Sequence, residues 1–389
     1  MSPRETQRYT LAGPDAVERR IAADQQCVID GIRALLPVPK LHALVLAGGY
    51  GRGEGGYRMQ DGVPVPYNDY DYFVVVRGLR GAERSKLTRD LHVLAELLSR
   101  ELQLEVDFAV LASERLGRLP PCLMYSELKT GHRVLVGDPR ALDAIASPPA
   151  ADLPLAEFSR MMLNRGALLL MNAQALLEAG AVRTRASEQF LRYFSKGVLA
   201  AGDARLAAAG RYHPSMAERG RRVQELPWQG EGRERFLALY DLALQVKLGG
   251  AEDRILAPGE PHRLHRLGVH EWLQAYRLLE SVRLGQAPAS WQAYAAPQLS
   301  KGQDGRHWWS PLHHVALSLR RPFSGRGFTF SLPRLLRHPR ERLMAALPLL
   351  LESGTPAQNR LAAEALGAAA DAQWPGLADA FLVDWKRYC

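Results

Sequence analysis

The sequence predicts an α+β/α protein of two domains, in which a small mixed β-sheet with flanking helices is followed by an all-helical domain. Three observations lead to this prediction. Within residues 1–146 the hydrophobic pattern runs helix–strand–loop–strand–helix–strand, which is typical of an α/β domain. Across residues 155–389 almost every patterned segment has helical spacing. Between them, the proline-containing stretch SPPAADLP at 147–154 indicates a domain boundary.

Each element follows from its apolar spacing. Apolar residues three to four positions apart predict helices in the first domain over 14–36, 82–101 and 122–130. Short β-branched, aromatic or aliphatic runs predict strands over 41–47, 70–76, 104–111 and 133–136. In the second domain helices are predicted over 155–179, 186–209, 232–249, 270–284, 340–352, 357–371 and 375–387, with an irregular region over 297–333.

Composition and charge narrow the class of protein. No apolar run approaches the roughly 20 residues of a membrane span, and the polar N-terminus lacks the core of a secretory signal. Cys27, Cys122 and Cys389 match neither a zinc pattern nor a disulfide framework, so we expect a cytoplasmic protein that is not attached to a membrane. Residues 1–150 carry 19 basic and 19 acidic side chains, so the net charge of +9 lies in the remainder. This charge would attract an anionic partner or form an arginine-rich solvated surface.

The stretch from residue 41 to 76 carries the chemistry of the first domain. One apolar run ends at Gly48 and Gly49, and the next has Asp69 and Asp71 at its start. Strand residues alternate sides, so the two carboxylates are expected on one face, where they repel each other unless a cation bridges them. Oxygen ligands favour magnesium, and the N–H groups of a glycine turn bind phosphate oxygens. Together these residues indicate a metal–nucleotide site.

The glycines Gly51, Gly53 and Gly56 formally match the dinucleotide-binding fingerprint. That fingerprint opens a helix, whereas the following residues, YRMQDGVPVPYND, contain two prolines and no helical pattern, so we discount it. No Gly-Lys-Ser/Thr follows, which excludes a Walker loop. A flexible glycine hairpin without a ligand is the structural alternative.

A third acid, Asp107, lies in the middle of the predicted strand 104–111, where aspartate is disfavoured. This strand follows the 70–76 strand after one helical crossover, so we expect the two strands to be neighbours and Asp107 to project beside Asp69 and Asp71. Three carboxylates can hold two cations about 4 Å apart for in-line phosphoryl transfer. A surface or strand-end position without function is the alternative for each acid.

In combination, Gly48-Gly49, Arg52-Gly53, Asn68-Asp69-Tyr70-Asp71 and Val106-Asp107-Phe108 resemble the DNA polymerase β-type nucleotidyltransferase superfamily. The resemblance covers about residues 17–140. It implies a nucleotidyltransferase-type small mixed β-sheet with flanking helices, two Mg²⁺ ions, for which Mn²⁺ could substitute, and an NTP donor that releases pyrophosphate.

The resemblance also implies a role for each matched residue. Gly48 and Gly49 would face the triphosphate. Catalysis and metal binding would rest on Asp69, Asp71 and Asp107, of which Asp107 would bind the catalytic metal and help to activate the acceptor.

Two features depart from the superfamily pattern. Gly49 stands where serine is commoner, which removes one hydroxyl contact to phosphate. The segment between Gly49 and Asp69 is longer than usual, and the insertion around 57–67 would close over the site or recognise the acceptor.

Three further side chains are candidates for nucleotide binding. Arg52 would either contact phosphate or have only a structural role in its loop. Lys196, in the predicted helix 186–209, would neutralise the triphosphate or lie in solvent. Tyr212, placed at the end of the same helix, would stack on the base or pack against the helix end.

We therefore expect a magnesium-dependent nucleotidyltransferase that moves an NMP from an NTP, with ATP the expected donor, to an acceptor hydroxyl. The sequence leaves the acceptor open among a small molecule such as an aminoglycoside-like antibiotic, a sugar, a protein side chain, a nucleic acid with an RNA 3′ end, and a second nucleotide in a cyclic product. It also leaves the oligomeric state open. The alternative function is a non-catalytic nucleotide-binding or partner-binding protein with a nucleotidyltransferase fold, against which the complete carboxylate set argues.

Overall fold

The chain forms two compact units in the computed structural model, which describes residues 8–146, 148–149, 152–179, 184–228, 231–249, 256–257, 259–296, 299, 301–302, 310–319, 336–352 and 355–389. The first unit comprises Met1–Pro154, Gly210–Glu225 and Leu244–Arg254. The second comprises Leu155–Ala209, Leu226–Ala243 and Ile255–Cys389. Two short segments from beyond residue 155 therefore belong to the first unit.

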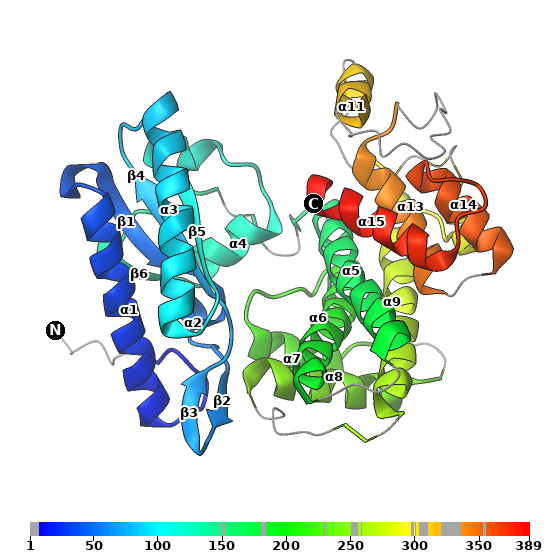
Figure 1. Cartoon of the computed structure of the whole chain (residues 1–389), viewed down its shortest axis with the longest axis horizontal. Coiled ribbons are helices and arrows are strands. Elements are labelled where there is room, and N and C mark those ends of the chain that lie inside the picture. Colours follow the sequence, from blue (N-terminus) through cyan, green and yellow to red (C-terminus); the bar gives the residue numbers. More distant parts are fainter. Residues whose placement is uncertain are drawn as a thin grey trace. The chain divides into compact units, whose positions relative to one another are not determined.

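The first unit is built on a four-stranded sheet in the order β5-β4-β1-β6 (Figure 1). Its strands are β1 (Leu41–Leu46), β4 (Tyr70–Val76), β5 (Val106–Ala112) and β6 (Arg133–Gly137). Strand β1 is antiparallel to β4 and β6, whereas β4 and β5 are parallel, so the sheet is mixed, as predicted. A parallel pair needs a crossover connection, which helix α3 (Gly81–Leu102) provides between β4 and β5.

The two faces of this sheet are covered by different elements. Alternate residues of each strand point to opposite faces. One set, which includes Leu46, Tyr72 and Val74, packs on α1 (Asp15–Leu35) and α3. The other set packs on α4 (Leu123–Thr130) and on the turn near Leu142, and includes Ala43, Val45, Ala47, Phe73, Val75 and Leu111. The central strands β1 and β4 are thus buried over most of their length, whereas β5 and β6 are mostly partly buried or exposed.

The segment between β1 and β4 holds more structure than the predicted loop. It begins with a short helix, α2 (Gly48–Arg52), and continues as a hairpin of β2 (Tyr57–Gln60) and β3 (Val63–Pro66). The hairpin turns at Asp61 and Gly62, whose φ angles of 51° and 79° are both positive. An Asp-Gly pair favours this two-residue turn, so the sequence contained a signal for the hairpin. Short 3₁₀ helices occur at Val38–Lys40 and Ser113–Arg118.

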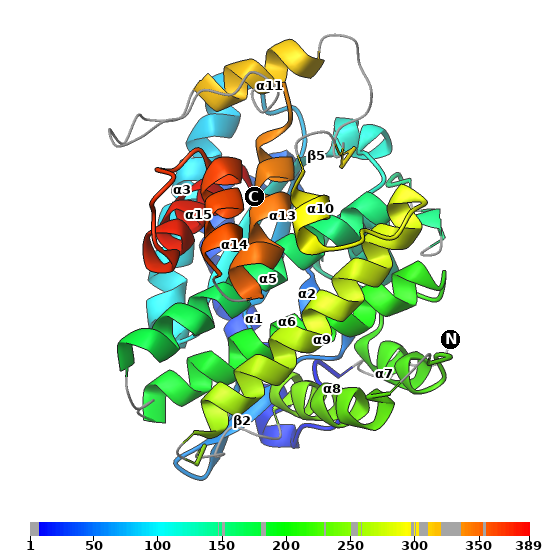
Figure 2. The same cartoon turned by 90° about the vertical axis from the view of Figure 1, so that its right-hand side faces the viewer.

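The second unit is helical in the part of it that the structure describes. Helices α5, α6 and α9 pack against one another (Figure 2), and α13 packs against α5, α14 and α15. Helix α8 (Arg233–Leu248) crosses from the second unit to the first, and α7 (Met216–Gln224) belongs to the first. The helices of the second unit are α5 (Leu155–Ala179), α6 (Thr184–Ala208), α9 (Glu260–Leu284), α10 (Trp291–Ala295), α11 (Ser310–Leu319), α13 (Pro339–Leu351), α14 (Pro356–Leu366) and α15 (Trp374–Tyr388).

Most predicted helices are confirmed, with differences at helix ends and in short elements. Helix α9 begins at Glu260, ten residues before the prediction, and continues through Gly268. A Cβ on Gly268 would lie 2.8 Å from the Phe194 ring, so packing on α6 explains this glycine inside a helix. Helices α7 and α10 were not predicted, and α11 lies in the region predicted as irregular, most of whose remainder is outside the described residues. None of the described helices is long and apolar enough to span a membrane.

Candidate active site

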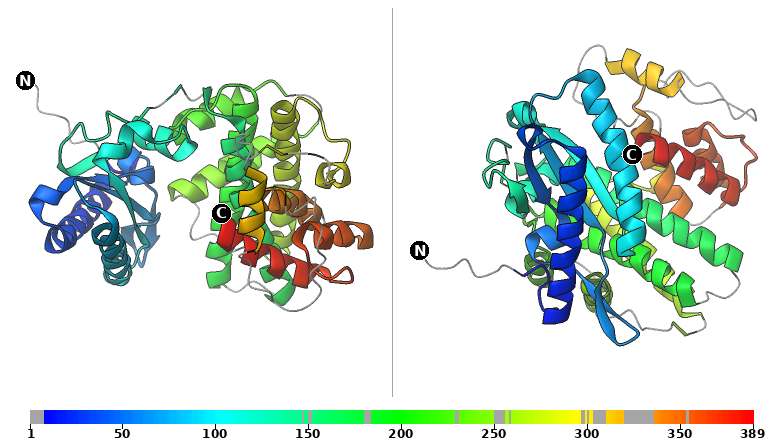
Figure 3. Two further views of the ribbon diagram at one scale, coloured as in Figure 1. Left: turned by 90° about the horizontal axis from the view of Figure 1, so that it is seen from above. Right: turned by 60° about the vertical axis from the view of Figure 1, so that its left-hand side comes forward.

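Asp71 and Asp107 lie directly opposite each other on neighbouring strands. In the parallel pairing of β4 with β5, the register partner of Asp71 is Asp107. Both side chains belong to the sheet face that carries Phe73 and Leu111, because strand residues alternate between faces. Helices α1 and α3 cover the opposite face of the sheet (Figure 3). Asp71 is partly buried and Asp107 is exposed, so the pair lies where this face opens to solvent. The sequence-based expectation that the two strands are neighbours is confirmed.

Asp69 lies in the short link that precedes β4. It is partly buried, and its neighbour Asn68 is 6% exposed. The Asn68 side-chain oxygen accepts a 2.7 Å hydrogen bond from the N–H of Gly56, which anchors this link to the hairpin stem. At the other end, the Tyr70 N–H donates to the carbonyl of Glu105 and begins the parallel ladder. Asp69 is therefore held between two fixed points beside the start of β4.

Gly48 lies against the Asp71 carboxylate. Its φ of +62° falls in the left-handed region, and a Cβ at this position would collide with Oδ2 of Asp71. The preceding residue, Ala47, donates a 2.8 Å backbone hydrogen bond to the carbonyl of Asp71. Gly48 and Asp71 thus come from two strand ends that meet at one point. By contrast, the nearest atoms to a Cβ on Gly49 belong to the backbone of Glu54 and Gly55.

The glycine pair opens a short helix where a turn was expected, whereas the residues after Gly56 form the β2–β3 hairpin, in agreement with the expectation that no helix follows them. Helix α2 is five residues long and ends at Gly53, whose φ is +78°. Gly51 lies inside this helix, where a side chain would collide with the carbonyl of Leu46. The dinucleotide fingerprint instead requires its glycines at the junction that precedes a long helix. Gly51 serves the close packing of α2 on β1, so the fingerprint remains discounted.

Tyr50 connects α2 to both ends of the hairpin. Its side chain is 0% exposed, and its hydroxyl donates to the carbonyl of Gly56 at 2.6 Å. The same oxygen accepts hydrogen bonds from the N–H groups of Tyr67 at 3.0 Å and Asn68 at 3.2 Å. Burial raises the pKa of Tyr50, so this side chain stays a neutral phenol. One buried hydroxyl therefore determines where the chain enters the link that carries Asp69.

Tyr50→Phe is expected to lower the free energy of unfolding by about 2 kcal/mol, because it leaves the N–H groups of Tyr67 and Asn68 without their acceptor. Urea unfolding would measure the change. Tyr125→Phe is the control, since the Tyr125 hydroxyl makes no hydrogen bond among the described residues, and a change within about 0.5 kcal/mol is expected. Equal effects of the two substitutions would refute the role given to Tyr50.

Arg52 lies between two carboxylates. Its side chain is 12% exposed, with Nε 3.2 Å from Glu54 and a terminal nitrogen 3.8 Å from Glu127. Tyr212 donates its hydroxyl hydrogen to Glu127, and the guanidinium of Arg219 lies 5.3 Å from the centre of the Tyr212 ring. Arg52 and Tyr212 therefore meet in one polar network. Their direct contact with a nucleotide stays a prediction.

Tyr212 does not lie on the helix to which the sequence assigned it. Helix α6 ends at Ala208, and Tyr212 follows in the segment that belongs to the first unit. Tyr212 is 3% exposed, which agrees with the packing role considered as the alternative to base stacking.

Lys196 lies on α6 in the second unit and is partly buried. Its role at a triphosphate stays a prediction.

Glu54 is the residue of this region that the sequence reasoning missed. It is 6% exposed and accepts hydrogen bonds from the Ser215 hydroxyl at 2.6 Å and from the N–H groups of Met216 and Ala217 at 3.0 and 3.3 Å. Burial by itself raises the pKa of Glu54, but these bonds and the Arg52 charge outweigh it, so the pKa lies below its ordinary value. A carboxylate at the first turn of α7 also interacts favourably with the helix dipole.

The sequence contained part of the signal for this contact. Ser215 is followed three residues later by Glu218, a capping pattern that marks the start of a helix. The structure confirms that Ser215 is the N-cap of α7 and accepts from the Glu218 N–H. Nothing in the local pattern indicates that Glu54, more than 160 positions earlier, completes this cap.

The donor chemistry at the sheet edge suits a hard cation. Asp71 and Asp107 offer carboxylate oxygens from paired positions on adjacent strands, and both reach solvent. Across the described residues, however, no group of three or more His, Cys, Asp or Glu side chains is arranged to hold a metal ion.

Comparisons with protein-family models, with curated proteins and with solved structures found no match.

Proposed function

We propose that the first unit is a magnesium-dependent nucleotidyltransferase domain that transfers an NMP from an NTP to an acceptor hydroxyl. One observation carries this proposal. The register of β4 and β5 makes Asp71 and Asp107 direct partners, and the Asp71 carboxylate lies against Gly48. The glycine turn and two of the three acids that resemble the nucleotidyltransferase superfamily are therefore adjacent in space, although they are up to 59 positions apart in the sequence.

Each of the residues at this site would have a distinct role in the reaction. Asp69, Asp71 and Asp107 would hold magnesium, which supplies positive charge to the triphosphate when bound. Asp107 is exposed, so an acceptor hydroxyl can reach its carboxylate and pass it a proton. The acceptor oxygen forms a bond to the α-phosphorus, the bond from that phosphorus to the bridging oxygen breaks, and pyrophosphate leaves. Tyr50 and Asn68 keep the link that carries Asp69 in place.

Binding of nucleotide with magnesium is the first test. A ligand bound only by the folded state raises stability by RT ln(1 + [L]/Kd), or about 2.7 kcal/mol at a concentration 100 times Kd. ATP with magnesium is therefore expected to raise the melting temperature by about 2–5 °C. ATP with EDTA, and magnesium with adenosine, are the controls and are expected to have smaller effects. No shift with any NTP and magnesium would contradict the proposal.

An assay of catalysis distinguishes this function from that of a non-catalytic nucleotide-binding protein. Incubation of the full chain with α-labelled ATP, magnesium and cell extract is expected to release pyrophosphate and to label one acceptor. Mass spectrometry of the labelled product would identify the acceptor class. A melting shift without pyrophosphate release from any NTP would favour the non-catalytic alternative.

A further inference from the structure

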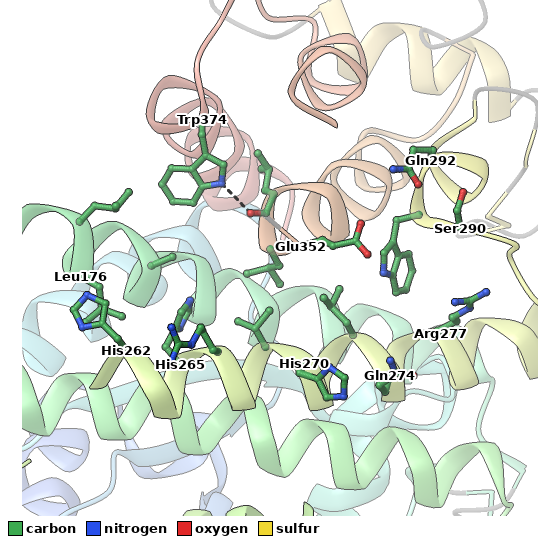
Figure 4. Close-up of a pocket in the computed structure, with 18 of the residues that line it drawn as sticks. Leu176, His262, His265, His270, Gln274, Arg277, Ser290, Gln292, Glu352 and Trp374 are labelled. Carbon is green, nitrogen blue, oxygen red and sulfur yellow. Dashed lines mark hydrogen bonds between the residues drawn. The ribbon is translucent and has the colours of Figure 1, made fainter. Parts of the chain in front are cut away.

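A pocket of about 1000 Å³ lies within the second unit (Figure 4). One face of α9, from His262 to Arg277, lines its length. At 1.5 Å per residue this face is about 22 Å long. The other walls come from α5, α10, the end of α13 and the start of α15. The pocket is therefore elongated and is formed by several helices of one unit.

Its interior is mainly apolar. Leu176, Val269, Leu273, Trp291, Leu350 and Leu351 line it and are buried. Leu177, also in the lining, is 68% exposed, which leaves apolar surface open to water at the pocket. The Trp374 ring is held in place by a 2.8 Å hydrogen bond from its Nε1 to the carbonyl of Leu350. An elongated apolar molecule would remove this surface from water.

The charge of the lining favours an anion. Arg266 and Arg277 both line the pocket, and among the described residues neither has a carboxylate within ion-pair distance. Burial lowers the pKa of His265 to about 4, so the permanent positive charge rests on the two arginines. The acid in the lining, Glu352, accepts a 2.6 Å hydrogen bond from Gln358.

Arg277 of α9 meets polar side chains near the start of α10 at one end of this pocket. Figure 4 shows Arg277, Ser290 and Gln292 together at the end formed by α10, with Leu176, His262 and His265 at the other. The Arg277 guanidinium donates one 3.0 Å hydrogen bond to the carbonyl of Ala289, which holds it beside α10. The remaining N–H groups of a guanidinium match the planar geometry of a carboxylate.

We propose that this pocket binds a long-chain carboxylate, with the carboxylate at Arg277 and the acyl chain along α9 towards His262. The length of the lined face, its apolar interior and Arg277, which has no acidic partner among the described residues, together select this class of ligand. The proposal concerns the second unit alone and does not depend on nucleotidyl transfer.

Calorimetric titration of the full chain with palmitate, below its micelle concentration, tests this proposal. Saturable binding of one palmitate is expected. Hexadecyltrimethylammonium, which carries a similar chain on a cationic head, is expected to bind at least about tenfold more weakly, a difference of about 1.4 kcal/mol. Absence of saturable palmitate binding, or equal binding of the two amphiphiles, would overturn the proposal.

The palmitate affinity of variants with substitutions in the pocket lining tests where the ligand binds. Arg277→Gln is expected to weaken palmitate binding about tenfold or more, because it removes the charged partner of the carboxylate. Arg263→Gln is the matched control on α9, since Arg263 is exposed and does not line the pocket, and unchanged affinity is expected. Ala173→Trp fills the pocket and Leu177→Glu places a negative charge at an exposed position of its lining, so both are expected to abolish binding. Wild-type affinity in Arg277→Gln, or in a folded blocking variant, would place the ligand elsewhere and refute the site.

Discussion

Asp71→Asn is expected to reduce magnesium-dependent pyrophosphate release at least about 1000-fold, equivalent to about 4 kcal/mol of lost transition-state stabilisation. The amide keeps the shape of the side chain but removes the charge from the position that contacts Gly48 and pairs with Asp107. Asp107→Asn is expected to have a similar effect, since it removes the partner carboxylate on the adjacent strand. Single-turnover assays with labelled ATP would measure both losses.

Asp90→Asn is the matched control for these variants. Asp90 lies on α3, which packs on the opposite face of the sheet, and its carboxylate is 2.6 Å from Lys86. The same chemical change is therefore expected to leave turnover unchanged. Thermal unfolding of all three variants would confirm that the fold is retained. Undiminished turnover in either active-site variant, or an equal loss in Asp90→Asn, would contradict the assignment of Asp71 and Asp107.

Glu54→Gln is expected to lower the free energy of unfolding by about 2–4 kcal/mol at neutral pH. The substitution removes a buried charge that is paired with Arg52 and accepts three hydrogen bonds at the start of α7. The side-chain amide of glutamine also carries N–H donors, which would face the N–H donors of Met216 and Ala217. Urea unfolding at pH 7 would measure the effect. Glu96→Gln, a surface change on α3, is expected to alter stability by less than about 0.5 kcal/mol.

The destabilisation by Glu54→Gln is expected to depend on pH. Because the pKa of Glu54 in the folded state lies below its ordinary value of 4.5, its ionised form stabilises the fold above that value. This contribution diminishes as the pH falls below about 4.5 towards the folded-state pKa. The difference between the wild type and Glu54→Gln should therefore narrow between pH 6 and pH 3. A difference that stays constant over this range would show that the carboxylate charge is not its cause.

Much of the first unit could be predicted because its elements obey local rules. Short β-branched, aromatic or aliphatic runs identified β4 and β5, and helical spacing identified α1 and α3 within a residue or two of their ends. That β4 and β5 are neighbours was also predicted, from the single helical crossover between them. Their register did not follow from the sequence, because it depends on how both faces pack.

The short elements were harder to predict because their stability comes from distant contacts. Helix α2 has five residues, too few to be stable by local propensity, and it depends on Gly51 packing against β1 and on the Tyr50 hydroxyl. In the second unit, α9 continues through Gly268, where the close approach of Phe194 on α6 leaves no room for a Cβ. In each case the deciding partner lies beyond the range of a local pattern.

The glycine pair and the acids were recognisable from the sequence alone because strand alternation and the rarity of aspartate inside strands are local properties. The tertiary structure alone placed Asp71 opposite Asp107, brought α7 to Glu54 and formed the elongated pocket along α9. These arrangements join segments up to 163 positions apart in the first unit. They arise when buried side chains and backbone groups find partners during packing, which spacing along one segment cannot specify.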